Sequence, residues 1–143
     1  MAYSTLNDIK KLISEASVTQ LTDDENTGAV NQTRVDEAIA QADAEIDTYC
    51  GQVFTVPFTT VPDIVKKASV DIAIYNLYSR RVEQMPETRR DRYKDAIALL
   101  TKIAEGKISI GEQPEPASPG EGGVQSTKTL DDRIFTSKSM SGF

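Results

Sequence analysis

Apolar residues in the segment that begins at Pro62 recur at helical spacing on two stripes rather than one. The first stripe is Ile64, Ala68, Ile72 and Tyr75, and the second is Val70, Ile74, Leu77 and Tyr78. Together they cover most of the circumference of a helix, and a helix with that pattern is normally surrounded by others. Pro62 suits the first turn because its fixed φ is already helical. The sequence therefore predicts a central, buried helix.

Three other segments carry a narrower apolar stripe at helical spacing. They run from Thr5 to Ser14, from about Thr33 to Gly51 and from about Glu87 to Glu105. Thr5 with Asp8, and Thr33 with Asp36, match the capping box of a helix start, and Gly106 is a typical stop. No persuasive alternating run predicts a strand. We expect an all-α body of four helices, of which the third is central.

The region between the second and third helices, VFTVPFTTV, is apolar but interrupted by Pro57. We expect an extended, packed loop whose aromatic residues close one end of the core. Cys50, the single cysteine, cannot form an internal disulfide and is expected to be a small buried residue.

The last part of the chain changes composition at Gly111. The run GEQPEPASPGEGGVQSTKT is almost free of apolar side chains, so it cannot bury enough surface to offset its ordering entropy. It leads to a peptide with five sizeable apolar residues: Leu130, Ile134, Phe135, Met140 and Phe143. We expect a helical body over 1–110, a flexible tether over 111–129 and a docking peptide over 130–143. The alternative is that the peptide folds back onto its own body.

The composition argues against chemistry. There is no histidine, which removes the commonest general base and metal ligand, and the formal charge of −6 disfavours a protein that coats nucleic acid. The acidic loop from Asp23 places Gly28 sixth, as calcium loops do, but Arg34 stands twelfth where a glutamate is needed. We expect a turn whose Asp and Asn residues bond the local backbone. We expect no enzyme activity, no metal, no cofactor and no membrane span, and hence a soluble, unsecreted protein.

One charged cluster lies about the junction of the third and fourth helices. It consists of Arg80, Arg81, Arg89, Arg90, Arg92 and Lys94. These side chains could contact phosphates or an acidic protein face. The alternative is that nearby acidic residues neutralise them as surface pairs: Glu83, Glu87, Asp91 and Asp95.

Several segments resemble, in order, a family of small proteins from Mu-like phages and prophages. They are MAYSTLNDIKKLI, QLTDD, RVDEAIAQADAEIDTYC, the loop with VPF, VPDIVKKASVDIAIYNLYSRR and the closing RIFTSKSMSGF. The layout is similar to that of head–tail connector, or adaptor, proteins of long-tailed phages. None of these segments is a catalytic motif.

The resemblance implies a structural virion protein that is assembled in the bacterial cytoplasm and located at the neck. It would form a homo-oligomeric ring, dodecameric in the virion, beneath the portal protein. The C-terminal arm would grip the portal, a neighbouring subunit, or a neck or tail-completion protein, and DNA would be present only as the passing genome.

The alternative function is a small nucleic-acid-binding regulator that uses the Arg80–Lys94 cluster. A salt titration separates the two functions, because tight and steeply salt-dependent binding to duplex DNA is expected only of the regulator.

Overall fold

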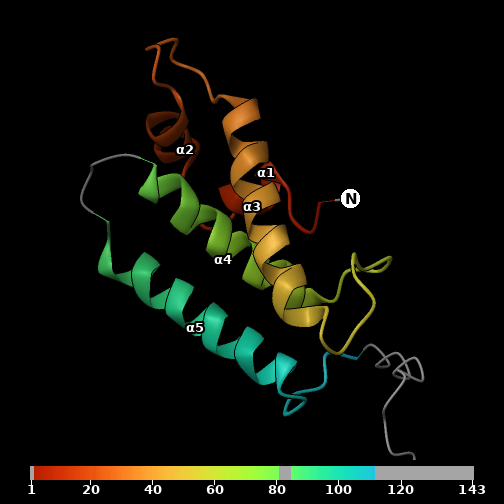
Figure 1. Cartoon of the computed structure of the whole chain (residues 1–143). Coiled ribbons are helices and arrows are strands. Elements are labelled where there is room, and N and C mark those ends of the chain that lie inside the picture. The colour runs from red at the N-terminus through yellow and green to blue at the C-terminus, as the bar shows by residue number, and fades with distance from the viewer. Residues whose placement is uncertain (1, 81–84, 112–143) are drawn as a thin grey trace, which may run out of the picture.

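Five helices follow one another in the computed structural model, which describes residues 2–80 and 85–111. They are α1 (Leu6–Lys10), α2 (Glu15–Thr22), α3 (Gln32–Cys50), α4 (Asp63–Ser79) and α5 (Glu87–Ala104) (Figure 1). These described residues include no strand, and the expected all-α class is confirmed. Most of the expected tether and the whole docking peptide over 130–143 lie outside the described residues.

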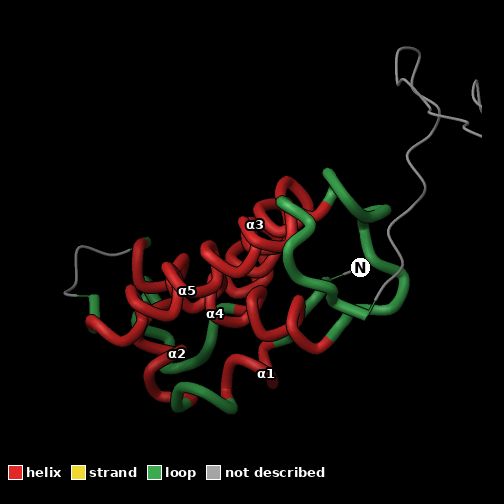
Figure 2. The backbone as a smooth tube through the Cα atoms, turned by 90° about the horizontal axis from the view of Figure 1, so that it is seen from below, coloured by secondary structure: helices red, strands yellow, loops and turns green. Residues whose placement is uncertain are grey.

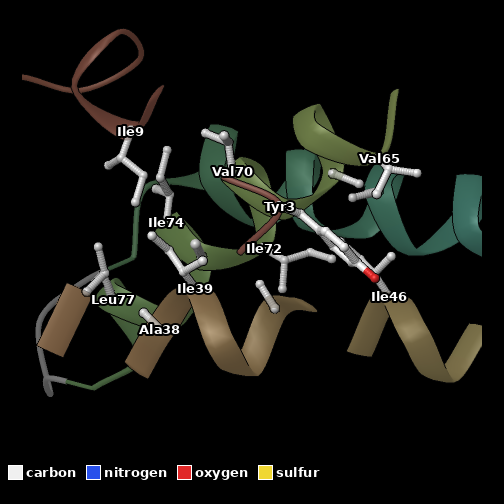
Figure 3. Packing of buried hydrophobic residues seen from close by; sticks show 14 of the residues in the cluster. Tyr3, Ile9, Ala38, Ile39, Ile46, Val65, Val70, Ile72, Ile74 and Leu77 are labelled. Carbon is white, nitrogen blue, oxygen red and sulfur yellow. The ribbon is translucent and has the colours of Figure 1, made fainter. Parts of the chain in front are cut away.

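Helix α4 is the centre of the body, as predicted. It contacts each of the other four helices, and Ile72, Ile74 and Leu77 have no exposed surface. Figure 2 shows α3 on one side of α4 and the α1–α2 pair on the other. Side chains from α1, α3 and α4 meet in the interior that Figure 3 shows. No helix of the described part is long and apolar enough to cross a membrane.

Helices α3 and α5 each turn one face toward α4. The buried residues of α3 are Val35, Ala38, Ile39, Ala42, Ile46 and Cys50, and those of α5 are Ala96, Leu100 and Ile103. Gly106 ends α5 with φ of 74°, a left-handed conformation that suits glycine. Its N–H donates to the carbonyl of Ile103 at 3.0 Å, and that of Lys107 donates to Lys102 at 2.9 Å. This pair of bonds is the Schellman arrangement, so the predicted stop at Gly106 is confirmed.

An aromatic joint connects the three long helices. Tyr75 of α4 stacks on Tyr93 of α5 with ring centroids 3.9 Å apart and an interplanar angle of 10°. The Tyr93 hydroxyl donates to Glu45 of α3 at 3.0 Å. Burial, and then this bond to a carboxylate, raise the pKa of Tyr93 to about 12. The joint therefore fixes the rotation of α5 relative to α3 and α4.

The N-terminal region differs from the single helix expected over 5–14. The Thr5–Asp8 capping box is present, but α1 ends at Lys10, and Ser14 instead caps a second short helix, α2. The Ser14 hydroxyl accepts from the Ser17 N–H at 3.2 Å. The chain thus forms two short helices instead of one. Ile9 and Ile13 reach the core from the first part, and the apolar residues of α2 reach it from the second. The signal that was missed is the Ser14 cap followed by Val18 and Leu21 one turn apart.

Helix α3 begins one residue before the expected start. Asn31, not Thr33, is the N-cap, and its side chain accepts from the Arg34 N–H at 3.3 Å. The Asn31 N–H donates to the Thr22 hydroxyl at 3.1 Å, which holds Asn31 at the end of α2. The tertiary bond to Thr22 thus fixes the choice between two acceptable caps. Pro62 is likewise the N-cap of α4, and the helix proper begins at Asp63.

The loop before α4 closes one end of the core, as expected. Phe54 and Phe58 are buried, and the Phe58 ring lies 5.7 Å from that of Tyr3. After α5, Ile108 and Ile110 pack partly buried against the core without forming a strand. The C-terminal ends of α3 and α5 and the last described residues gather at this same end of the body (Figure 1).

Asp8 connects α1 to α4 through its carboxylate. It accepts from the Thr5 N–H at 2.9 Å and the Thr5 hydroxyl at 2.8 Å, and it lies 3.4 Å from Lys66 of α4. Burial by itself would raise the pKa of this carboxyl. The hydrogen bonds from Thr5, together with Lys11 and Lys66, outweigh burial and lower the pKa below its usual value.

Replacement of Leu77 tests the central position of α4. Leu77→Ala should lower the free energy of unfolding by about 2–5 kcal/mol, because it leaves a cavity in the core. Leu12→Ala is the matched control, since Leu12 is 39% exposed, and it should cost under about 1 kcal/mol. Urea unfolding followed by circular dichroism measures both. Equal losses would contradict a core centred on α4.

Replacement of Asp8 tests the ionic contact between α1 and α4. Because folding lowers the pKa of Asp8, its stabilisation is present above the unfolded value of about 3.9 and disappears as pH falls through the folded value. Asp8→Asn should therefore cost about 1 kcal/mol at pH 7 and much less near pH 3. Urea midpoints at both pH values, with Asp91→Asn as an exposed control, measure the difference. A gap independent of pH would show that the carboxylate charge is not the stabilising element.

Candidate functional site

A groove of about 580 Å³ lies between residues 2–6 and the exposed side of α3, and we call it the α3 groove. Three carboxylates line it, those of Asp36, Asp43 and Asp47. Between them the helix presents the small side chains of Ala40 and Ala44, beside Ile39. The groove is therefore acidic along its length and allows close approach to the backbone of α3.

A hydrogen-bond network around the buried Tyr3 holds two of the carboxylates that line the α3 groove. The Tyr3 N–H donates to Asp43 at 2.9 Å, and its hydroxyl donates to Asp47 and accepts from the Phe58 N–H. Ser69 of α4 donates to Asp43 at 2.7 Å. The ring of Tyr3 reaches toward Ile46 on α3 (Figure 3). The network thus fixes the first residues of the chain to α3 and α4 at once.

The acidity of the α3 groove has an electrostatic consequence. Burial raises the pKa of Asp43 above its usual value, although the hydrogen bonds from Ser69 and Tyr3 oppose the rise. Burial and the bond to Asp47 raise the pKa of Tyr3 as well. Burial makes the charged form of Asp43 less favourable, and a positive charge placed in the groove would reduce this free-energy cost.

Part of the pattern that forms the groove is visible in the sequence. Asp36, Ala40, Asp43, Ala44 and Asp47 recur at helical spacing next to the apolar stripe of α3. Carboxylates at such positions on an amphipathic helix ordinarily face solvent, so the pattern by itself does not predict a groove. The groove exists because residues 2–6 return along this face, and periodicity within α3 does not contain that information.

The acidic loop after α2 behaves as the turn that the sequence predicted. The Asp23 carboxylate accepts from the N–H groups of Thr27 at 2.8 Å and Gly28 at 2.7 Å. Arg34, the residue that disagreed with a calcium loop, pairs with both oxygens of Glu25 at 2.7 and 2.8 Å. This bidentate bond lowers the pKa of Glu25. The carboxylates of the loop are thus used to bind an arginine and the local backbone.

Arg80 joins the end of α4 to the end of α2. Its guanidinium donates to the carbonyl of Leu21 at 2.7 Å and to Asp24 at 3.0 Å. Arg34 donates in the same way to the neighbouring carbonyl of Thr22 at 2.8 Å. Two cations therefore lie at the C-terminal end of α2, where the helix dipole and unpaired carbonyls favour positive charge.

Two other arginines of the predicted cluster also bind the protein's own fold. Arg89 donates to the carbonyl of Leu12 at 3.1 Å, and Arg92 lies 3.5 Å from Asp71, whose side chain is 2% exposed. The groups that bind Arg89 and Arg92 therefore lie in the chain after α1 and on α4. The alternative prediction, in which nearby acidic residues such as Glu87, Asp91 and Asp95 neutralise the cluster, named different partners. Packing of α5 against the rest of the body brings these distant groups together.

The cluster has two further members in the described part of the chain. Arg90 and Lys94 are exposed on α5, and Arg90 lines a shallow depression with Met85, Pro86 and Glu87. Arg81 and Glu83 lie outside the described residues, as do the five apolar residues of the predicted docking peptide. Cys50 is fully buried, and burial raises the pKa of its thiol to about 11, in agreement with a small core residue.

Replacement of Arg80 separates its structural role from a role in surface charge. Arg80→Ala should lower the free energy of unfolding by about 1–2 kcal/mol, because the Leu21 carbonyl and Asp24 lose a charged donor. Arg90→Ala removes the same charge from an exposed site and should change stability by under about 0.5 kcal/mol. Urea unfolding of both variants at equal salt measures the difference. Equal effects would contradict a specific role for Arg80 at the end of α2.

Comparisons with known proteins assign the lineage. The family model described as "Bacteriophage Mu, Gp36" matches residues 3–128. The chain is 28% identical over 140 residues to "Gene product J" of Escherichia phage Mu, a match that covers 96% of each chain. It is 35% identical over 83 residues to "Mu-like prophage FluMu protein gp36" of Haemophilus influenzae. That match covers 58% of this chain and spans 57% of the relative's length. The chain therefore belongs to the bacteriophage Mu Gp36 family, as its resemblance to small proteins of Mu-like phages and prophages indicated.

Proposed function

We propose that this phage protein is a structural virion assembly protein, a head–tail connector that forms a ring at the portal and docks through its C-terminal arm, the peptide 130–143. The observation that carries the proposal is the contrast between body and arm. The core cluster of the described part is built from residues between Tyr3 and Ile103, with Ile108 and Ile110 packed against it. The sequence then places five large apolar residues beyond a polar run.

The charges of the body support a structural role. Arg34, Arg80, Arg89 and Arg92 hold helices and loops together, and Asp8 and Asp71 lie buried or nearly so among cations. A body that uses its charges for internal cohesion is suited to being a rigid unit in a larger assembly. We propose accordingly that the protein is not an enzyme and acts without a cofactor.

The arrangement of the arm supports multivalent docking. The arm follows the last described residues, which lie at one end of the bundle beside the C-terminal ends of α3 and α5 (Figure 1). In a ring, all arms would leave equivalent positions and reach equivalent sites on the portal or on neighbouring copies. Effective concentration then makes a joint from contacts that are weak one by one. Phe135 and Phe143 are the proposed anchors, since buried aromatic side chains dominate interface energetics.

Removal of the arm tests the proposal. A chain truncated after Gly120 should keep its helical circular dichroism and its unfolding midpoint, because the described core ends before that residue. It should lose binding to the purified portal protein of the same phage, measured by co-sedimentation. Phe135→Ala and Phe143→Ala should each weaken binding by about 30-fold, which corresponds to about 2 kcal/mol.

The matched control is the full-length chain with Gln113→Ala and Gln125→Ala, which changes the polar run and leaves the arm intact. This control should bind the portal as the unchanged protein does. Unaltered attachment of the truncated chain would refute docking through the arm. A large loss of stability on truncation would show instead that the arm is part of the core.

A further inference from the structure

We propose that the α3 groove is the receiving site for residues 133–143 of a second copy of this chain. The inference rests on the proposed function, in which copies lie side by side in a ring. It adds a site on the body and makes a neighbouring copy the partner of the arm, so that portal binding depends on the arm through closure of the ring. The groove is built from residues 2–6 and α3. The helix packing of the described part leaves it open.

Charge complementarity is the first argument. The groove presents Asp36, Asp43 and Asp47, and the network at Tyr3 and Ser69 holds the last two in place. The segment 133–143 carries Arg133 and Lys138 and no acidic residue. A cation placed beside the half-buried Asp43 lowers the cost of its charge, and the attraction is stronger there than at a fully exposed carboxylate.

The chain before this segment has the opposite sign. Between 111 and 132 the acidic residues are Glu112, Glu115, Glu121, Asp131 and Asp132, against a single lysine at 128. Carboxylates of the groove repel this stretch and attract the segment that follows it. The charge pattern therefore selects which part of the chain enters the groove, which is a form of specificity.

Shape and apolar surface are the second argument. Ala40 and Ala44 leave room next to the α3 backbone, and Leu6 and Ile39 add apolar surface to the lining. A volume of about 580 Å³ lies within the range of sites that enclose a short ligand segment. Ile134 and Phe135 follow Arg133 directly, so one short stretch supplies both the charge and the apolar side chains that the groove accommodates.

The geometry suits docking between copies. Arm and groove are different surfaces, so an arm in a neighbour's groove is a heterologous contact, and such contacts close into rings when the rotation permits. The sequence predicts a coil for 111–129, with an average span of about 24 Å. A folded body of this size has a radius of gyration of about 13 Å, so that span reaches from one body to the next.

Site-specific disulfide formation tests the inference with full-length chains. One chain carries Ala40→Cys in the groove, and the other carries Thr136→Cys in the arm, which leaves the proposed anchor Phe135 in place. After mixing and mild oxidation, free and loaded on purified portal, the expected product is a linked heterodimer on a non-reducing gel. Its yield should exceed by at least about tenfold that from Glu37→Cys paired with Thr136→Cys, because Glu37 is exposed on α3 outside the groove. The native Cys50 is fully buried and does not compete.

The outcomes distinguish the two proposals. Attachment to the portal without the Ala40–Thr136 link would overturn the groove as the receiving site and leave the connector function intact. If the unchanged protein does not attach to the portal, the connector function is overturned instead. A third chain carries both cysteine substitutions. If it forms the link only within itself, both at high dilution and on the portal, the arm occupies its own groove, and the proposal of a second copy is refuted.

Charge exchange gives an independent measurement on the same chains. Asp36→Lys in the groove chain, or Arg133→Glu in the arm chain, should lower the yield of the link by up to about fivefold, and the two together should restore it. Glu37→Lys is the control and should leave the yield unchanged. Equal effects of Asp36→Lys and Glu37→Lys would show that overall charge, not the groove, determines the yield.

Discussion

Helix α4 is apolar around most of its circumference, and each of its sides must be covered for the chain to fold. Each of the other four described helices contacts it, and three of its polar residues have specific partners on them. Ser69 donates to Asp43 of α3, Asp71 meets Arg92 of α5, and Lys66 meets Asp8 of α1. The burial of α4 provides the hydrophobic driving force, and these three contacts fix which helix lies on which side.

The need to cover every side of α4 also explains the positions of the arginines near the α4–α5 junction. On the sequence they form a positively charged cluster, but in the fold Arg80, Arg89 and Arg92 point to three different parts of the body. Arg80 holds the end of α2, Arg89 holds the chain after α1, and Arg92 compensates a buried aspartate on α4. Arginine is suited to this role because its guanidinium donates several hydrogen bonds in fixed directions. A basic surface for nucleic acid would need these groups turned outward together.

The α3 groove has its origin in the way the chain begins. Tyr3 is fixed by its backbone to Asp43 and by its hydroxyl to Asp47, so residues 2–6 run beside α3 without filling the space above Ala40 and Ala44. Carboxylates that stabilise this arrangement also leave the groove acidic. One set of residues thus anchors the N-terminal segment and prepares a surface of defined charge. Family membership places the protein in Mu-like phages, and the proposed assembly role gives that surface a partner in the arm of an adjacent copy.

Local sequence patterns determined the three long helices, because periodic apolar residues, caps and Gly106 act within a few residues of one another. The same patterns determined the packed loop after Cys50, and the change of composition at Gly111 is likewise a property of the sequence alone. The tertiary structure decided what depends on contacts distant in sequence. It ended the expected first helix at Lys10 and added a second short helix after Ser14, so that Ile9 and Val18 both reach the core. It also chose Asn31 over Thr33 through a bond to Thr22. It also turned Asp36, Asp43 and Asp47 from an ordinary polar face into a groove, because only folding brings Tyr3 against α3.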